Sequence, residues 1–175
     1  MKSELTLWTI GHSTRPIEDF LALLEKHRIE AVADVRSFPG SRRNPQYGRE
    51  ALEDHLAQKR IGYRWIPALG GHRKPVANSP NVGWRNASFR GYADYMQTDA
   101  FAAGLDELIE LGARLRTTLM CAESVWWRCH RALIADALLA RGVDVEHILS
   151  AGPTTPHPGT APARIIDGRF TYSSA

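Results

Sequence analysis

Only two cysteines, Cys121 and Cys129, occur among the 175 residues. Two thiols do not make the disulfide framework on which small secreted domains depend, and a reducing compartment would keep both as thiols. No uncharged apolar run approaches the length that spans a bilayer. The apolar stretch near the N-terminus is too short for a secretory signal and is not followed by a small-residue cleavage site. We therefore expect a cytoplasmic protein that does not act at a membrane.

The composition, with 43% hydrophobic and 23% charged residues, is that of a globular protein. A chain of this length most simply forms one domain over residues 1–175, and it is long enough for a substantial core.

The net charge of +3 is unevenly distributed along the chain. Residues 36–90 contain eleven Lys/Arg and three Asp/Glu, a net +8, whereas the remainder has eleven and sixteen, a net −5. Aromatic residues are mixed into the basic region, and such a mixture can bind phosphates and stack on bases. Nucleic acid is therefore one candidate partner, and an ordinary solvated basic surface is the alternative.

Apolar runs alternate with helical patterns along the chain. The runs predict strands at residues 5–10, 30–35, 63–69, 116–120 and 145–149. Between them, helical spacing of apolar residues begins at Pro16, Arg49, Tyr92, Thr98 and Arg128. Strands that alternate with helices predict a single α/β domain with a mostly parallel sheet and helices on both faces.

Three segments lack this alternation. Residues 70–91 are rich in Gly, Pro and Asn, and a loop this long in a compact domain favours a mobile cover over a site. Residues 151–163 are loop-like. Residues 164–172 suggest a small C-terminal hairpin around Asp167 and Gly168.

Ionisable side chains follow nearly every predicted strand. Ligands of open α/β sheets bind outside the carboxyl ends of the strands, so these side chains are candidates for one shared site. Asp34 and Arg36 end an apolar strand, and such residues are rarely buried without a partner. They either face the site or form a structural ion pair at the edge of the sheet.

Several motifs together resemble a known family. The stretches "TIGHST", "ADVRSFP", "LGG", "FRGYADYM" and "LMCAE" followed by "CHR" resemble the uncharacterised bacterial family called domain of unknown function 488. The match covers residues 7 to about 149. The resemblance implies a compact α/β domain with a polar cluster drawn from these motifs, and it implies no established activity.

Thiolate chemistry at Cys121 is the first functional hypothesis. This cysteine ends a predicted strand just before a helix, where the helix dipole and free N–H groups lower the pKa of a thiol. Arg128 and Arg131 add positive charge, and His12 or His130 is the expected proton-transfer partner.

The strand–loop–helix layout is similar in outline to cysteine phosphatases and rhodanese-type sulfur transferases. The likeness is one of layout alone, because Glu123 in the loop would repel a phosphate or sulfate. We expect Cys129 to lie inside the following helix, where it packs like a small hydrophobic residue.

Two other hypotheses remain open. In a nucleotide or nucleic-acid site, Glu123 and Asp34 would be acid–base or ribose-binding groups, and three tryptophans would stack on bases: Trp84, Trp126 and Trp127. Zinc is the other possibility, because four residues are of types that bind zinc: Cys121, Cys129, His130 and His12. Their spacing is not that of a structural zinc site. We therefore predict no metal and no cofactor.

We expect an anion-accepting pocket at the carboxyl ends of the strands, with a small anionic ligand as partner. Cys121 is the candidate nucleophile, and His12 is its base or an oxyanion donor. Arg36 and Arg131 would hold the anion, while Asp34 and Glu123 would orient the arginines or shuttle protons. Further candidate binding residues are Ser13, His72, Arg73 and Arg128. The sequence names neither the substrate nor the oligomeric state, and it leaves open whether the protein is an enzyme.

Overall fold

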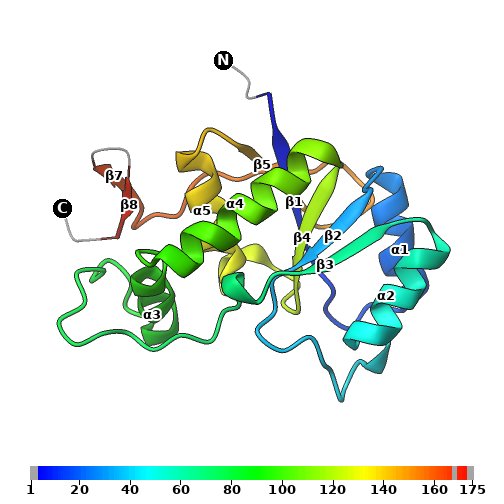
Figure 1. The fold of residues 1–175 in the computed structure, drawn as a ribbon, viewed down its shortest axis with the longest axis horizontal. Coiled ribbons are helices and arrows are strands. Elements are labelled where there is room, and N and C mark those ends of the chain that lie inside the picture. Colours follow the sequence, from blue (N-terminus) through cyan, green and yellow to red (C-terminus); the bar gives the residue numbers. More distant parts are fainter. Residues whose placement is uncertain (1–3, 167–168, 173–175) are drawn as a thin grey trace.

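A twisted six-stranded sheet forms the centre of the molecule (Figure 1). The computed structural model describes residues 4–166 and 169–172. The sheet has the order β3-β2-β4-β1-β5-β6. Its strands are β1 (Thr6–Gly11), β2 (Ala31–Asp34), β3 (Gly62–Trp65), β4 (Thr117–Cys121), β5 (Asp144–Ile148) and β6 (Thr155–Pro156). All neighbouring strands are parallel except β6, which pairs antiparallel with β5. The predicted mostly parallel α/β sheet is therefore confirmed.

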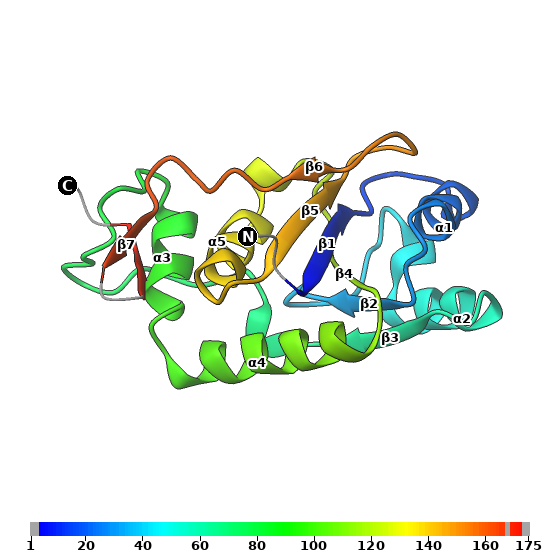
Figure 2. The same ribbon diagram turned by 90° about the horizontal axis from the view of Figure 1, so that it is seen from above.

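Helices cover both faces of the sheet (Figure 2). Helices α1 (Ile17–Lys26) and α2 (Arg49–Gln58) pack on one face, over Val32 and Met120. Helices α4 (Asp99–Arg114) and α5 (Arg131–Ala140) pack on the other face, over Ala33 and Leu119. Every residue of β2 and β4 is buried, because both faces of these central strands are covered.

The predicted element boundaries need three corrections. Helix α3 (Ala87–Tyr95) begins inside the expected loop of residues 70–91, because the side chain of Asn86 caps the N–H groups of Ser88 and Phe89. A 3-10 turn, Pro67–Leu69, replaces the second half of the predicted third strand. The short strand β6 lies in the segment that was expected to be a loop.

The expected C-terminal hairpin is present as an antiparallel pair, β7 (Arg164–Ile166) and β8 (Arg169–Thr171). Its expected turn, Asp167 and Gly168, lies outside the described residues. The pair lies beside α3, at the end of the molecule away from α1 and α2 (Figures 1 and 2). Tyr172 follows β8 and donates a hydrogen bond to Asp136 of α5. The end of the chain is thereby attached to the core.

No helix in the described part of the chain is long and apolar enough to cross a membrane.

Candidate functional site

A cleft of about 970 Å³ opens at the carboxyl ends of β1, β2 and β4. Parallel strands end at one edge of the sheet, and the segments that follow them form the walls of the cleft. Of the ten predicted site residues, eight line it: His12, Ser13, Arg36, His72, Arg73, Cys121, Glu123 and Arg128. The other two, Asp34 and Arg131, are fully buried behind its floor.

Positive charge dominates the walls of this cleft. The lining includes six Arg/Lys residues and one carboxylate, Glu123. Four of these cations have no ion-pair or hydrogen-bond partner among the described residues, namely Arg42, Arg43, Lys74 and Arg128. Arg42 and Arg43 were not among the predicted site residues, although this adjacent pair in a polar turn after β2 was a usable signal. Lys74 was expected only in the cover over the pocket.

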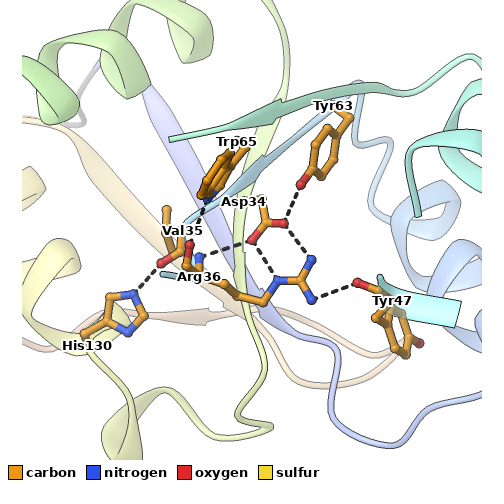
Figure 3. Close-up of polar contacts among 7 residues, drawn as sticks. All are labelled: Asp34, Val35, Arg36, Tyr47, Tyr63, Trp65 and His130. Atoms are coloured by element: carbon orange, nitrogen blue, oxygen red, sulfur yellow. Dashed lines mark hydrogen bonds and ion pairs between the residues drawn. The ribbon is translucent and has the colours of Figure 1, made fainter. Parts of the chain in front are cut away.

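Asp34 and Arg36 form a buried ion pair at the end of β2 (Figure 3). Arg36 Nε and Nη2 donate to the two carboxylate oxygens of Asp34 at 2.9 and 2.6 Å, and Nη1 donates to the carbonyl of Tyr47 at 2.8 Å. Tyr63 donates a further hydrogen bond to Asp34 at 2.6 Å. All three guanidinium nitrogens of Arg36 are therefore engaged. Asp34 and Arg36 therefore form a structural ion pair, and the guanidinium of Arg36 is not free to bind a ligand in this structure.

The backbone between these two residues fixes an imidazole on the cleft floor (Figure 3). His130 Nε2 lies 2.7 Å from the carbonyl oxygen of Val35 and donates its hydrogen there. The other ring nitrogen, Nδ1, then carries a lone pair, and it lies 3.3 Å from Sγ of Cys129. Burial lowers the pKa of His130. A neutral imidazole of fixed tautomer thus faces the Cys129 thiol as a proton acceptor.

Cys129 lies before helix α5 and not inside it, contrary to the expectation from sequence. A 3-10 turn, Trp126–Arg128, interrupts the helical pattern, and α5 begins at Arg131. The backbone N–H of Arg131 is directed at Sγ of Cys129, with 3.5 Å between N and Sγ. Cys129 therefore has the position at a helix N-terminus that was predicted for Cys121.

The two thiols lie in contact on the cleft floor. Both cysteines are free, and their Sγ atoms are 2.8 Å apart. Burial and the contact with Cys129 raise the pKa of Cys121 well above its ordinary value. Burial also acts to raise the pKa of Cys129, but the Cys121 thiol and the Arg131 groups outweigh it and lower this pKa. The two pKa shifts therefore have opposite directions, and Cys129 is the more acidic thiol of the pair.

Arg131 supplies the buried positive charge next to this thiolate. It is 0% exposed, and its guanidinium donates to Oγ1 of Thr9 and to the carbonyl oxygens of Glu123 and Ser124. No carboxylate among the described residues pairs with it, and its Nε has no hydrogen-bond partner there. A buried cation without a carboxylate favours an anion nearby, and Arg131 lowers the pKa of the Cys129 thiol. We expected Arg131 to hold the ligand, but its buried side chain does not line the cleft.

His12 is a second neutral imidazole at the cleft. Its ring stacks on Tyr47 with 4.2 Å between centroids, and Nδ1 lies 2.8 Å from the carbonyl oxygen of Ser13, to which it donates. Burial lowers the pKa of His12 from 6.5 to about 4. Its Nε2 is buried and has no partner among the described residues. This nitrogen therefore presents a free lone pair, which suits the predicted role of a base.

A chain of buried hydrogen bonds continues behind Arg131. Oγ1 of Thr9 lies 2.5 Å from Nδ1 of His147, whose Nε2 lies 2.9 Å from Nδ1 of His157. His157 contacts Asp136 of α5 at 2.8 Å. This row of hydrogen bonds links the cleft floor to the C-terminal segment. It was not predicted from the sequence.

Close packing of backbone against the site requires glycine at two positions. A Cβ on Gly71 would lie 2.7 Å from Nδ1 of His130. A Cβ on Gly11 would lie 1.6 Å from the carbonyl oxygen of Glu123, the atom that Arg131 binds. These approaches give a physical reason for the glycines of "LGG" and "TIGHST".

The tryptophans expected to stack on bases are mostly packed. Trp126 stacks on His147 with 4.7 Å between ring centroids, and Trp84 packs edge-on against Phe89. Only Trp127 of these three has a largely exposed side chain, at 52%. Within residues 4–166 and 169–172, no three His, Cys, Asp or Glu side chains are grouped so that they could hold a metal ion.

Comparisons with known proteins point to one family. No curated protein and no solved structure matches the chain. A family model described as "Domain of unknown function DUF488" matches residues 16–138, a span that includes the Asp34–Arg36 pair, both cysteines and His130. The chain therefore belongs to the DUF488 family.

Proposed function

We propose that the protein binds a small anionic substrate in the cleft and attacks it with the Cys129 thiolate. The observation that carries this proposal is the surroundings of Sγ of Cys129. A lone-pair nitrogen of His130, the N–H of Arg131 and the thiol of Cys121 all contact it at the floor of a cationic cleft. A nucleophile, an oriented base and a fixed cation in contact form the arrangement that thiol catalysis uses.

The proposed substrate is a small phosphorylated or sulfur-containing anion. The unpartnered cations in the cleft walls attract negatively charged ligands. Six Arg/Lys residues line the cleft and Glu123 is the one carboxylate there, so the net charge of the lining favours an anion. Cys129 replaces Cys121 as the proposed nucleophile, because His130 Nδ1 and the N–H of Arg131 both contact its Sγ and its pKa is lowered. His130 takes the thiol proton. The unpartnered Nε2 of His12 is buried, so it would act as a base only if a substrate displaces the atoms that cover it.

The rates of two matched alkylating reagents test this proposal. Iodoacetate is anionic and iodoacetamide is neutral, so their rate ratio at Cys129 reports the electrostatic attraction of the cleft. We expect this ratio to be about tenfold higher in the folded protein than in the unfolded chain, and to fall when salt is added. Peptide mass mapping assigns the modification to Cys129.

Matched variants locate the source of the effect. Replacing Arg42 and Arg43 together by alanine should lower the ratio. Replacing the exposed arginines Arg64 and Arg141, which pair with Glu107 and Asp106 outside the cleft, should leave it unchanged. Equal ratios in the folded and the unfolded protein would show that the cleft does not attract anions.

A nucleotide or single-stranded nucleic acid is the second candidate ligand. One observation favours it: Phe38, at the cleft, is 78% exposed and stands near Arg42 and Arg43 in the lining. An exposed ring beside cations can stack on a base while the cations hold phosphates. Binding of a labelled oligonucleotide, measured at low and high salt, tests this candidate. The absence of binding at low salt removes it.

A further inference from the structure

The second thiol on the cleft floor has no role in a simple attack by Cys129. Cys121 ends β4, and Cys129 lies eight residues later at the start of α5, so the fold brings the two sulfurs together across an intervening loop. Both side chains line the cleft, although each is nearly buried, at 2% and 6% exposure. A core packing role alone would not place both thiols at the floor of a cationic cleft.

We propose that Cys121 and Cys129 form a redox pair that reduces a small anionic disulfide, with Cys129 as the attacking thiol and Cys121 as the resolving thiol. This inference rests on the proposed function and narrows its substrate to one sulfur chemistry. A phosphoryl group on Cys129 would leave Cys121 without a task. A mixed disulfide on Cys129 would place a reactive sulfur within reach of Cys121.

One round of the reaction balances without a cofactor, and a small thiol reductant must then reduce the Cys121–Cys129 disulfide before another round. In the first step the Cys129 thiolate attacks one sulfur of the substrate R–S–S–R′, a Cys129–S–S–R bond forms, and R′–S⁻ departs. In the second step the sulfur of Cys121 attacks Sγ of Cys129, a Cys121–Cys129 disulfide forms, and R–S⁻ departs with the Cys121 proton as R–SH. The substrate gains two electrons, and the pair of thiols loses them.

The geometry needs little movement for the second step. The Sγ atoms are 2.8 Å apart, and a disulfide bond is about 2.05 Å long. The intervening loop contains the exposed residues Glu123, Trp127 and Arg128. The buried cation Arg131 stabilises the Cys129 thiolate, which is the species that attacks the substrate disulfide.

Dithiobis(nitrobenzoate), an anionic aromatic disulfide that releases a coloured thiolate, tests this inference on the whole protein. The wild type should release two equivalents of thiolate and finish without an adduct, lighter by two hydrogen atoms. Arg128 lies between the two cysteines, so trypsin separates them, and the product should appear as two peptides joined by a Cys121–Cys129 disulfide. Cys121→Ser and Cys121→Ala should each release one equivalent and keep a stable nitrobenzoate adduct on Cys129.

The wild type alone decides the outcome, whether or not the variants fold. A nitrobenzoate adduct that persists on Cys129 of the wild type would overturn the role of Cys121 and leave the proposed function standing. A Cys129 that does not react at all would overturn both. Adducts on both cysteines, without a disulfide between them, would also contradict the redox pair.

Discussion

The surroundings of the Cys129 thiol come from three separate parts of the chain. His130 contacts Sγ, but its tautomer is fixed by the carbonyl of Val35, and Arg131 is held by the loop that follows β4. The sequence predicted a thiolate at a helix N-terminus but assigned it to Cys121. Apolar spacing cannot reveal that a 3-10 turn delays the helix until Arg131, because that turn depends on tertiary contacts.

The sequence also could not decide the role of Asp34 and Arg36. It allowed either a site-facing position or a structural ion pair, and the hydrogen bonds of the structure show the ion pair. Replacing Asp34 by asparagine leaves the buried Arg36 cation without its counter-charge. We expect this change to lower the free energy of unfolding by about 3–5 kcal/mol. Urea denaturation monitored by circular dichroism measures it.

An exposed ion pair provides the control for this prediction. Asp106 pairs with Arg141 at the surface, so Asp106→Asn should cost no more than about 1 kcal/mol. Equal costs for the two variants would mean that the buried pair contributes no more than a surface contact.

Among the elements, the central strands were the most predictable. The apolar runs of β2 and β4 are buried on both faces, and a parallel sheet under two helix layers requires such runs. The short strand β6 was not predicted, because a two-residue edge strand has no period to detect. The sequence also assigned the first five residues of α3 to a loop and predicted a helix only from Tyr92, since the capping by Asn86 is a local contact with little apolar patterning around it.

The segment after the 3-10 turn Pro67–Leu69 holds His130 in place through Gly71. A methyl group on Gly71 would meet Nδ1 of His130 at 2.7 Å, so Gly71→Ala must displace the imidazole. We expect a stability loss of about 1–3 kcal/mol from overpacking, together with slower alkylation of Cys129 at neutral pH. Gly40→Ala is the matched control, because a Cβ there meets no atom within 4 Å. A Gly71→Ala protein with wild-type alkylation rates would show that the position of His130 does not govern the thiol.

Across the whole molecule, buried polar groups connect the cleft to the C-terminal segment. A continuous chain of contacts runs through the core from Arg131 to Asp136, by way of Thr9, His147 and His157. Their separation along the sequence reaches 138 residues for Thr9 and His147, so no local pattern indicates their contact. Strand alternation did predict that the ends of β1, β2 and β4 share one edge, and eight of the ten predicted site residues line the cleft at that edge.

Two buried histidines, His12 and His147, predict a specific sensitivity to acid. Burial lowers the pKa of His12 to about 4 and that of His147 to about 3, whereas both would titrate near 6.5 in the unfolded chain. Between these values the unfolded state binds more protons, so the free energy of unfolding should fall as the pH drops below 6.5. Urea denaturation at a series of pH values measures this slope. His12→Gln should make it shallower, and the control His55→Gln on α2 should not. A wild-type stability that does not change between pH 6.5 and 4 would refute this reading.

The pH dependence of Cys129 alkylation in the folded wild-type protein tests the central claim most directly. Limited labelling with iodoacetamide, followed by mass mapping of the tryptic peptides, follows the two cysteines separately. We predict that Cys129 reacts with a midpoint well below the free-thiol value of about 8.5, while Cys121 stays protected. A midpoint for Cys129 at or above about 8.5, or labelling of Cys121 ahead of Cys129, would contradict a thiolate held at the cleft floor.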